Sequence, residues 1–137
     1  MNARQIKTNP DSMEPFNIAQ GYTVGNLIFT SGQAAIDSEG NIVGVDDFDA
    51  QAEQVFKNLS DVLQQGGSSL AQVMKVTIYL TDMTNFMKVV ALRERFFSAP
   101  YPADTLIEVS SLALPELEIE IEAVALTQDS TIEASLL

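Results

Sequence analysis

The chain has 137 residues, the length of one domain, and 46% of them are hydrophobic, which is too many for a disordered protein. It contains no cysteine and no histidine, which excludes disulfides and thiolate nucleophiles and removes the usual zinc ligands. Its net charge of −12, from 19 acidic and 7 basic residues, disfavours binding to nucleic acids and to anionic membranes.

No stretch approaches the ~20 apolar residues that span a bilayer, and the first residues lack the apolar core of a signal peptide. No Asp-rich loop has the spacing of calcium or magnesium ligands. We therefore expect a cytoplasmic protein that binds no metal and needs no cofactor.

The first elements are strands. Residues 1–16 are polar and contain two prolines, so we expect them to be irregular. Residues 19–24 and 27–30 read as two strands, and Gly25-Asn26 between them is a tight-turn signal. A short extended piece follows the second strand.

An amphipathic helix comes next. Asp46 or Asp47 can cap its first turn, and Gly66-Gly67 ends it. Apolar residues recur at helical spacing, which predicts a stripe that packs on a sheet. This stripe contains Phe48, Ala52, Val55, Phe56, Leu59, Val62 and Leu63.

The second half repeats the alternation of strands and a helix. Residues 73–80 are rich in β-branched side chains and predict a strand. A helix over Phe86–Phe97 follows, capped by Asp82 or Thr84 and ended by two prolines. Its expected inner face contains Phe86, Val89, Val90 and Phe97. Two strands, 106–109 and 117–126, precede a polar tail at 127–137.

The order β-β-α-β-α-β-β predicts a single α+β domain over residues 1–137, a sandwich of a mixed sheet with both helices on one face. The strands also carry apolar residues on the other face. An oligomer packed sheet to sheet would cover that second face.

The last strand carries the most informative run, Glu118-Ile119-Glu120-Ile121-Glu122. Strict alternation places the three glutamates on one face of the strand and the isoleucines on the other. Because histidine and cysteine are absent, any acid–base chemistry depends on a carboxylate. The sequence therefore predicts that one of these glutamates lies at the mouth of a pocket.

Four motifs in order resemble the RidA/YjgF family of reactive-intermediate deaminases. They are Gly25-Asn26-Leu27-Ile28-Phe29-Thr30-Ser31-Gly32-Gln33, Val76-Thr77-Ile78-Tyr79-Leu80-Thr81-Asp82-Met83, Tyr101-Pro102-Ala103 and Glu120-Ile121-Glu122-Ala123-Val124-Ala125. The resemblance covers about residues 16–126 and leaves 127–137 as a tail. It implies a chorismate-mutase-like fold and a homotrimer that binds a small-molecule ligand in clefts between its subunits.

The resemblance also implies an activity, the hydrolysis of 2-imino acids to 2-oxo acids and ammonia. Carried over by position, Glu120 holds the attacking water as the catalytic residue, and Ser31, Gly32 and Gln33 help to bind the substrate. The family's carboxylate-binding arginine, a bidentate ligand, falls on Asp104. This reversal from cation to anion predicts altered substrate choice.

Three further pocket positions depart from the family pattern. Its usual tyrosine falls on Ile18, its helix asparagine on Val90 and its cysteine on Leu106. Asp104 and Glu120 together in one cleft would raise the pKa of one carboxyl or would favour a cationic ligand. Arg93 or Arg95 could replace the missing guanidinium, although an exposed position on the helix is the simpler interpretation.

Three functions remain open from the sequence. The chain could be an imine or enamine deaminase with altered substrate choice, a metabolite-binding trimer without turnover, or an acidic partner-binding, chaperone-like protein. Each functional residue also has a structural alternative: a solvated strand glutamate, a strand-end glycine and a turn aspartate. The family has been described as endoribonuclease-like, and the net charge of −12 makes that chemistry unattractive here.

Overall fold

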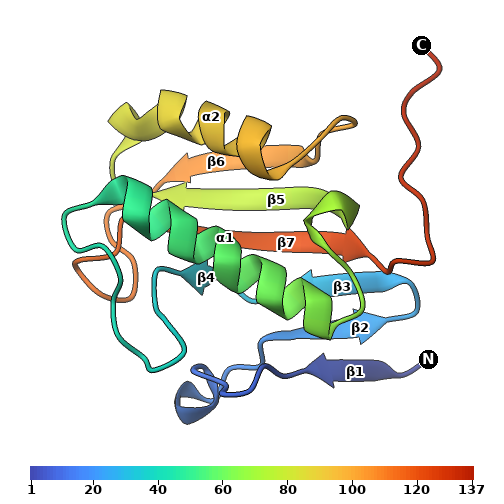
Figure 1. Ribbon diagram of the computed structural model, residues 1–137, viewed down its shortest axis with the longest axis horizontal. Coiled ribbons are helices and arrows are strands. Elements are labelled where there is room, and N and C mark those ends of the chain that lie inside the picture. The colour runs from blue at the N-terminus through green and yellow to red at the C-terminus, as the bar shows by residue number, and fades with distance from the viewer.

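A seven-stranded mixed sheet carries both long helices on one face (Figure 1). The computed structural model describes residues 1–137. Most of the sheet follows the order β1-β2-β3-β7-β5-β6, and β4 pairs with β7 beyond the end of β3. The strands are β1 (Ala3–Ile6), β2 (Gly21–Val24), β3 (Leu27–Thr30), β4 (Gln33–Ala34), β5 (Val73–Leu80), β6 (Ala103–Glu108) and β7 (Ile119–Leu126).

The centre of the sheet is the antiparallel pair β5 and β7. On both strands every second residue is buried beneath the helices, as the alternation predicts: Val76, Ile78, Leu80, Ile119, Ile121, Ala123 and Ala125. β6 runs parallel to β5 at one edge of the sheet. The predicted α+β fold with helices on one face is confirmed.

Helix α1 (Phe48–Gln65) crosses the middle of the sheet (Figure 1). Its predicted apolar stripe is buried throughout. The Phe56 ring stacks on Phe96 with 4.3 Å between centroids and meets the edge of Phe97 at 5.7 Å, which joins α1 to the end of α2 (Phe86–Phe96). Aromatic contacts of this kind add to the burial of the rings.

The cap of α1 is Asp47, one of the two predicted residues. Its Oδ1 accepts a hydrogen bond from Ala50 N at 3.1 Å. We expect Asp47→Ala to lower the free energy of unfolding by about 1 kcal/mol, because the amide loses its acceptor. Urea denaturation measures this change. Asp47→Asn keeps an acceptor and should retain most of the stability, so an equal loss in both variants would contradict a capping role.

The second helix begins at Phe86 as predicted, but its cap differs from the prediction. Asp82 caps a separate 3-10 turn, η3 (Met83–Asn85), by accepting from Thr84 N at 2.9 Å, and α2 follows this turn without a side-chain cap. Phe86 was expected on the inner face but is 45% exposed. Val89 and Phe97, from the same predicted face, are buried, and Val90 is half-buried.

The expectation that residues 1–16 are irregular is also wrong in part. β1 pairs antiparallel with β2 at the edge of the sheet, and its last residue, Ile6, is buried against the end of α1. A Cβ on Gly66 would lie only 2.7 Å from Ile6 Cδ1, so glycine at the helix end makes room for this contact. Pro10 lies outside regular secondary structure as predicted, whereas Pro15 lies in a short 3-10 helix, η1 (Glu14–Phe16).

The face of the sheet opposite the helices is uncovered in the single chain. Large apolar side chains stand exposed on it, which agrees with the expectation from the strand pattern: Tyr22, Leu27, Phe29 and Ile107. No helix has the length and apolar character needed to cross a membrane. Residues 127–137 have no regular structure: the first four remain hydrogen-bonded to the domain through Gly67 and Gln72, and the rest lead away from it (Figure 1).

Candidate functional site

The three glutamates around β7 have three different environments. Glu118 Oε2 accepts from Gln51 Nε2 at 3.3 Å, and Glu122 Oε1 accepts from the Tyr79 hydroxyl at 2.5 Å. The bond to Glu122, helped by burial, raises the pKa of Tyr79 to about 12, so the phenol remains the donor. Glu120 lies between these two residues on the strand and takes part in neither bond.

The Glu120 carboxylate lies against the backbone of Gly32. A Cβ at Gly32 would stand 2.4 Å from Glu120 Oε2, so only glycine allows this approach. Partial burial raises the pKa of Glu120, and the neighbouring Glu122 charge adds to the effect. A carboxylate whose pKa is raised binds a proton more readily than an ordinary one, which suits a group that accepts a proton from water. The structure therefore brings together Gly32 and Glu120, two of the residues carried over from the family.

Ser31 and Gln33 flank this glycine but face other groups. The Ser31 hydroxyl donates to Ala19 O at 2.5 Å, which uses its proton and leaves no base to activate it. Gln33 is 3% exposed and points to the helix side of the sheet. The structure thus places Gly32 beside Glu120, whereas the Ser31 and Gln33 side chains hold the backbone around it.

Asp104 is paired with a cation from helix α2. Arg93 Nε and Nη2 donate to its two carboxylate oxygens at 2.8 and 3.0 Å, a bidentate ion pair whose side chains are 27% and 17% exposed. Arg95 pairs instead with Glu53 on α1, at the exposed surface. Of the two arginines considered from the sequence, Arg93 therefore brings a guanidinium to Asp104.

The family model described as Endoribonuclease L-PSP matches residues 6–127. The chain belongs to the RidA/YjgF family. It is 37% identical to a RutC family protein of Pyrococcus abyssi, over 85% of this chain and 89% of the relative. It is 33% identical to the 2-iminobutanoate/2-iminopropanoate deaminase of Salmonella typhimurium, over 85% and 90%.

A solved RidA structure has the same fold. The crystal structure of RidA from an Antarctic Psychrobacter species superimposes with a TM-score of 0.82 at 31% identity, over 90% of this chain and 98% of that one. The mixed sheet with helices on one face is therefore the RidA/YjgF fold.

In this RidA/YjgF chain the candidate residues fall into two groups on opposite faces of the sheet. Glu120 lies opposite Tyr79 in the register of β5 and β7, on the uncovered face, where Gly32 also lies. Asp104 lies opposite the buried Val76 in the register of β5 and β6. Its side chain points to the helices, as its bond to Arg93 requires. Asp104 and Glu120 therefore do not share a cleft within one chain.

The three apolar candidate residues, Leu106, Val90 and Ile18, are likewise separated in the structure. Leu106 lies on the helix side of β6, packed against the core, and half-buried Val90 lies one turn before Arg93 on α2. Ile18 is exposed just before the segment that binds Ser31. Two cavities, of about 110 and 400 Å³, lie elsewhere and include none of Glu120, Asp104 or Ile18.

Sequence reasoning missed the roles of Tyr79 and of the Arg93–Asp104 pair. The Tyr79 contact follows from strand alternation, since Tyr79, Glu120 and Glu122 share one face of adjacent strands. Glu118, which precedes β7, was predicted on the same face but bonds to Gln51 on α1 instead. The Arg93 contact has no comparable signal, because it joins a helix to an edge strand.

Proposed function

We propose that this chain is a RidA-type hydrolase that deaminates an imine or enamine to a carbonyl compound and ammonia. The observation that supports this most directly is the free Glu120 carboxylate against the Gly32 backbone. The family includes a relative named for imine deamination. We further propose that the substrate lacks a carboxylate, since the position of the family's arginine holds Asp104.

Glu120 would act on water. Its ionised carboxylate accepts a proton as the water oxygen attacks the imine carbon, and the carboxylic acid so formed gives that proton to the imine nitrogen. The tetrahedral amino alcohol then collapses: the carboxylate takes the hydroxyl proton and passes it to the amino nitrogen, the C–N bond breaks, and ammonia leaves as the C=O bond forms. The sum is one imine plus one water giving one carbonyl compound and one ammonia. We assign the orientation of the substrate to the backbone at Gly32, which lies against the Glu120 carboxylate.

We propose that the site is completed by a second subunit of a homotrimer. Glu120 lies on the uncovered sheet face, beside a row of exposed apolar side chains that a neighbouring sheet would cover. In such an assembly the Asp104 side of one subunit could meet the Glu120 side of the next. Sedimentation equilibrium should give three times the 14.9 kDa chain mass, and a monomer at assay concentrations would contradict the shared cleft.

The substrate assignment is tested with two imines of matched size. An amino acid oxidase generates 2-iminobutanoate and an amine oxidase generates the uncharged imine of butylamine, each with the purified protein present. Semicarbazide trapping measures the lifetime of each imine against its spontaneous hydrolysis. We expect faster hydrolysis of the uncharged imine only. Faster hydrolysis of 2-iminobutanoate would overturn the substrate assignment, and no effect on either would overturn the enzymatic function.

A further inference from the structure

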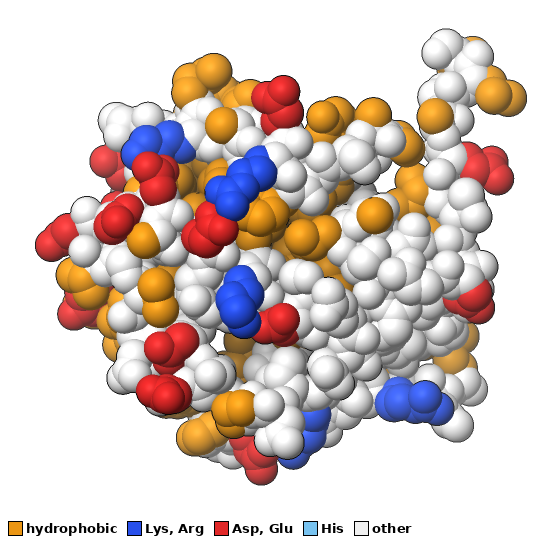
Figure 2. Space-filling model, in the orientation of Figure 1, with side chains coloured by type: hydrophobic (Ala, Val, Ile, Leu, Met, Phe, Trp, Pro, Cys, Tyr) orange, Lys and Arg blue, Asp and Glu red, His pale blue; other side chains and the backbone are white.

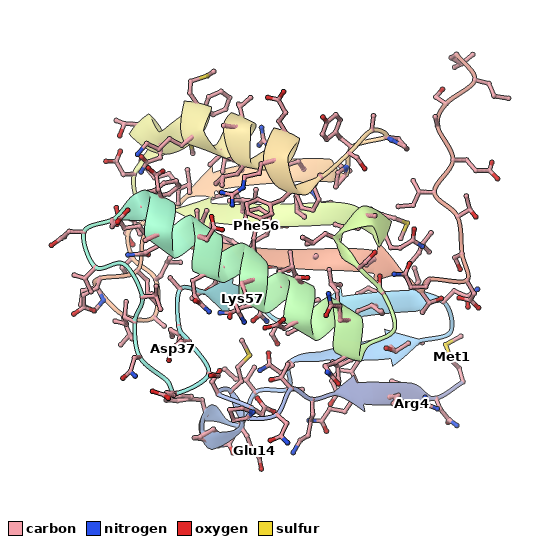
Figure 3. All side chains as sticks on the ribbon, viewed as in Figure 1. Met1, Arg4, Glu14, Asp37, Phe56 and Lys57 are labelled. Atoms are coloured by element: carbon pink, nitrogen blue, oxygen red, sulfur yellow. The ribbon has the colours of Figure 1, made fainter.

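A polar cavity of about 110 Å³ lies on the helix side of the domain, apart from Glu120 and Arg93. Its walls are residues 8–10 with Ser12, the side chains of Gln20 and Gln33, the turn at 36–38 and one side of α1, and Asp11 lies behind them. Figure 2 views the molecule from this side and shows the surface hollowed between α1 and the N-terminal segment, and Figure 3 places Lys57 on α1 above the turn with Asp37.

Two buried glutamines form a one-way relay of hydrogen bonds behind this cavity. Gln20 Nε2 donates to Asp11 Oδ1 at 3.0 Å and to Thr8 Oγ1 at 3.2 Å. Gln33 Nε2 donates to Gln20 Oε1 at 3.4 Å and to Ser31 O at 3.2 Å. Because a carboxylate only accepts, Asp11 fixes the orientation of both amides. Both N–H groups of each glutamine are used inside the relay.

The relay therefore ends in an acceptor. Gln33 is 3% exposed, lines the cavity, and has its Oε1 left over for a ligand. Hydrogen bonds in a chain polarise one another, so an anion at the start makes this terminal carbonyl more negative. Asp11 adds to this, since its Oδ2 is buried without a hydrogen-bond donor.

Two of the donors on the α1 wall are already engaged. Asn58 gives both N–H groups to the backbone, to Ala34 O at 2.9 Å and Ile36 O at 2.8 Å. The Lys57 ammonium is paired with Asp61 at 3.0 Å, and both of these side chains are exposed at the rim. The buried end of the relay thus offers the Gln33 oxygen as an acceptor and needs a donor from its ligand.

We propose that this cavity binds a small organic ammonium ion, whose N–H groups satisfy Gln33 Oε1 and whose charge complements Asp11. Directional N–H donors fit a single polarised amide oxygen better than a spherical metal ion does, since such an ion seeks several oxygens at once. The net charge of −12 favours any cation near the surface, so specificity has to come from the relay. This proposal does not rest on the deaminase proposal, although Gln33 also donates to Ser31 O beside Gly32.

Isothermal titration with four probes at constant ionic strength tests the assignment. The probes are n-propylammonium chloride, n-propanol, sodium propionate and potassium chloride. We expect saturable binding of n-propylammonium alone, with shifts of the Gln20 and Gln33 side-chain amide signals in nitrogen-15 NMR spectra. Equal binding of potassium would overturn the ammonium assignment, as would binding of propanol or propionate, or no binding of any probe.

Variants separate the relay from general charge. We expect Asp11→Asn to weaken n-propylammonium binding about tenfold or more, equal to ~1.4 kcal/mol. Glu133→Gln removes the same charge from the exposed tail and should leave binding unchanged. An equal loss in both variants would overturn the relay. A second pair needs no change in the interior: Lys57→Ala at the rim should tighten binding about twofold, whereas Lys7→Ala, outside the cavity, should not.

Discussion

Glu120→Gln is expected to reduce imine hydrolysis by about a hundredfold or more, the usual loss when a general base is removed. Glutamine keeps the shape of the side chain against Gly32 but cannot accept a proton from water. The measurement is the rate of imine loss above the spontaneous rate at pH 7.5. A variant that retains most of the activity would remove Glu120 from the chemistry.

Glu122→Gln is the matched control, because it lies on the same face of β7 and bonds to Tyr79. It should keep activity within about threefold if proton transfer belongs to Glu120. It should also move the acid limb of the pH–rate profile to lower pH. The Glu122 charge raises the pKa of Glu120, so removing that charge lets Glu120 ionise more easily.

The Glu120→Gln variant should be more stable than the parent protein at neutral pH. Burial raises the pKa of folded Glu120, so its ionisation costs stability as the pH rises through that value. Below the ordinary carboxyl range the parent side chain is protonated in both folded and unfolded chains, and the cost disappears. The melting temperature of Glu120→Gln should therefore exceed that of the parent at pH 7.5 and approach it at pH 4. A difference that grows toward low pH would contradict the direction of the shift.

Periodic patterns predicted the elements whose stability comes from burying one face. The apolar stripe of α1 and the alternation of β5 and β7 correspond to the buried residues almost one for one. β1 escaped prediction because Ala3, Arg4 and Gln5 are exposed, so its strand form depends on pairing with β2. Such pairing is a tertiary effect that local propensity does not contain.

The candidate site likewise has one part that the sequence could predict and one part that it could not. Gly32 and Glu120 could be assigned from motifs, and they do meet. The orientation of Asp104 could not, since it depends on the parallel register of β6 with β5 and on which helix covers that edge. Carrying the family's residues over by position shows which residues of this chain occupy the site. The contact partner of Asp104 can be identified only from the three-dimensional structure.

Asp104→Arg alone is expected to lower the free energy of unfolding by about 3 kcal/mol. It breaks a bidentate, largely buried pair and places two guanidinium groups together. The exchanged variant Arg93→Asp/Asp104→Arg restores opposite charges and should recover most of that loss. Urea denaturation of the four proteins in this cycle gives the coupling energy, expected at about 2 kcal/mol.

The exposed pair Lys57–Asp61 supplies the comparison for that cycle. Its side chains are 66% and 49% exposed, so its exchange, Lys57→Asp/Asp61→Lys, should show coupling below about 1 kcal/mol. Equal coupling in the two cycles would mean that the Arg93–Asp104 pair contributes no more than a surface contact.

The pair also determines how a missing arginine should be restored. In Asp104→Arg the new guanidinium is repelled by Arg93, so a lack of activity toward 2-iminobutanoate could reflect misplacement of the side chain. Arg93→Gln/Asp104→Arg removes that repulsion and leaves one guanidinium on β6, where the family carries its carboxylate ligand. We expect this double variant to accelerate hydrolysis of 2-iminobutanoate at least tenfold over the parent, because a bidentate contact to a carboxylate contributes more than 1.4 kcal/mol. If the double variant folds but does not accelerate the hydrolysis of 2-iminobutanoate, the identity of residue 104 does not determine substrate choice. The residues that determine it then have to be sought among Ile18, Val90 and Leu106.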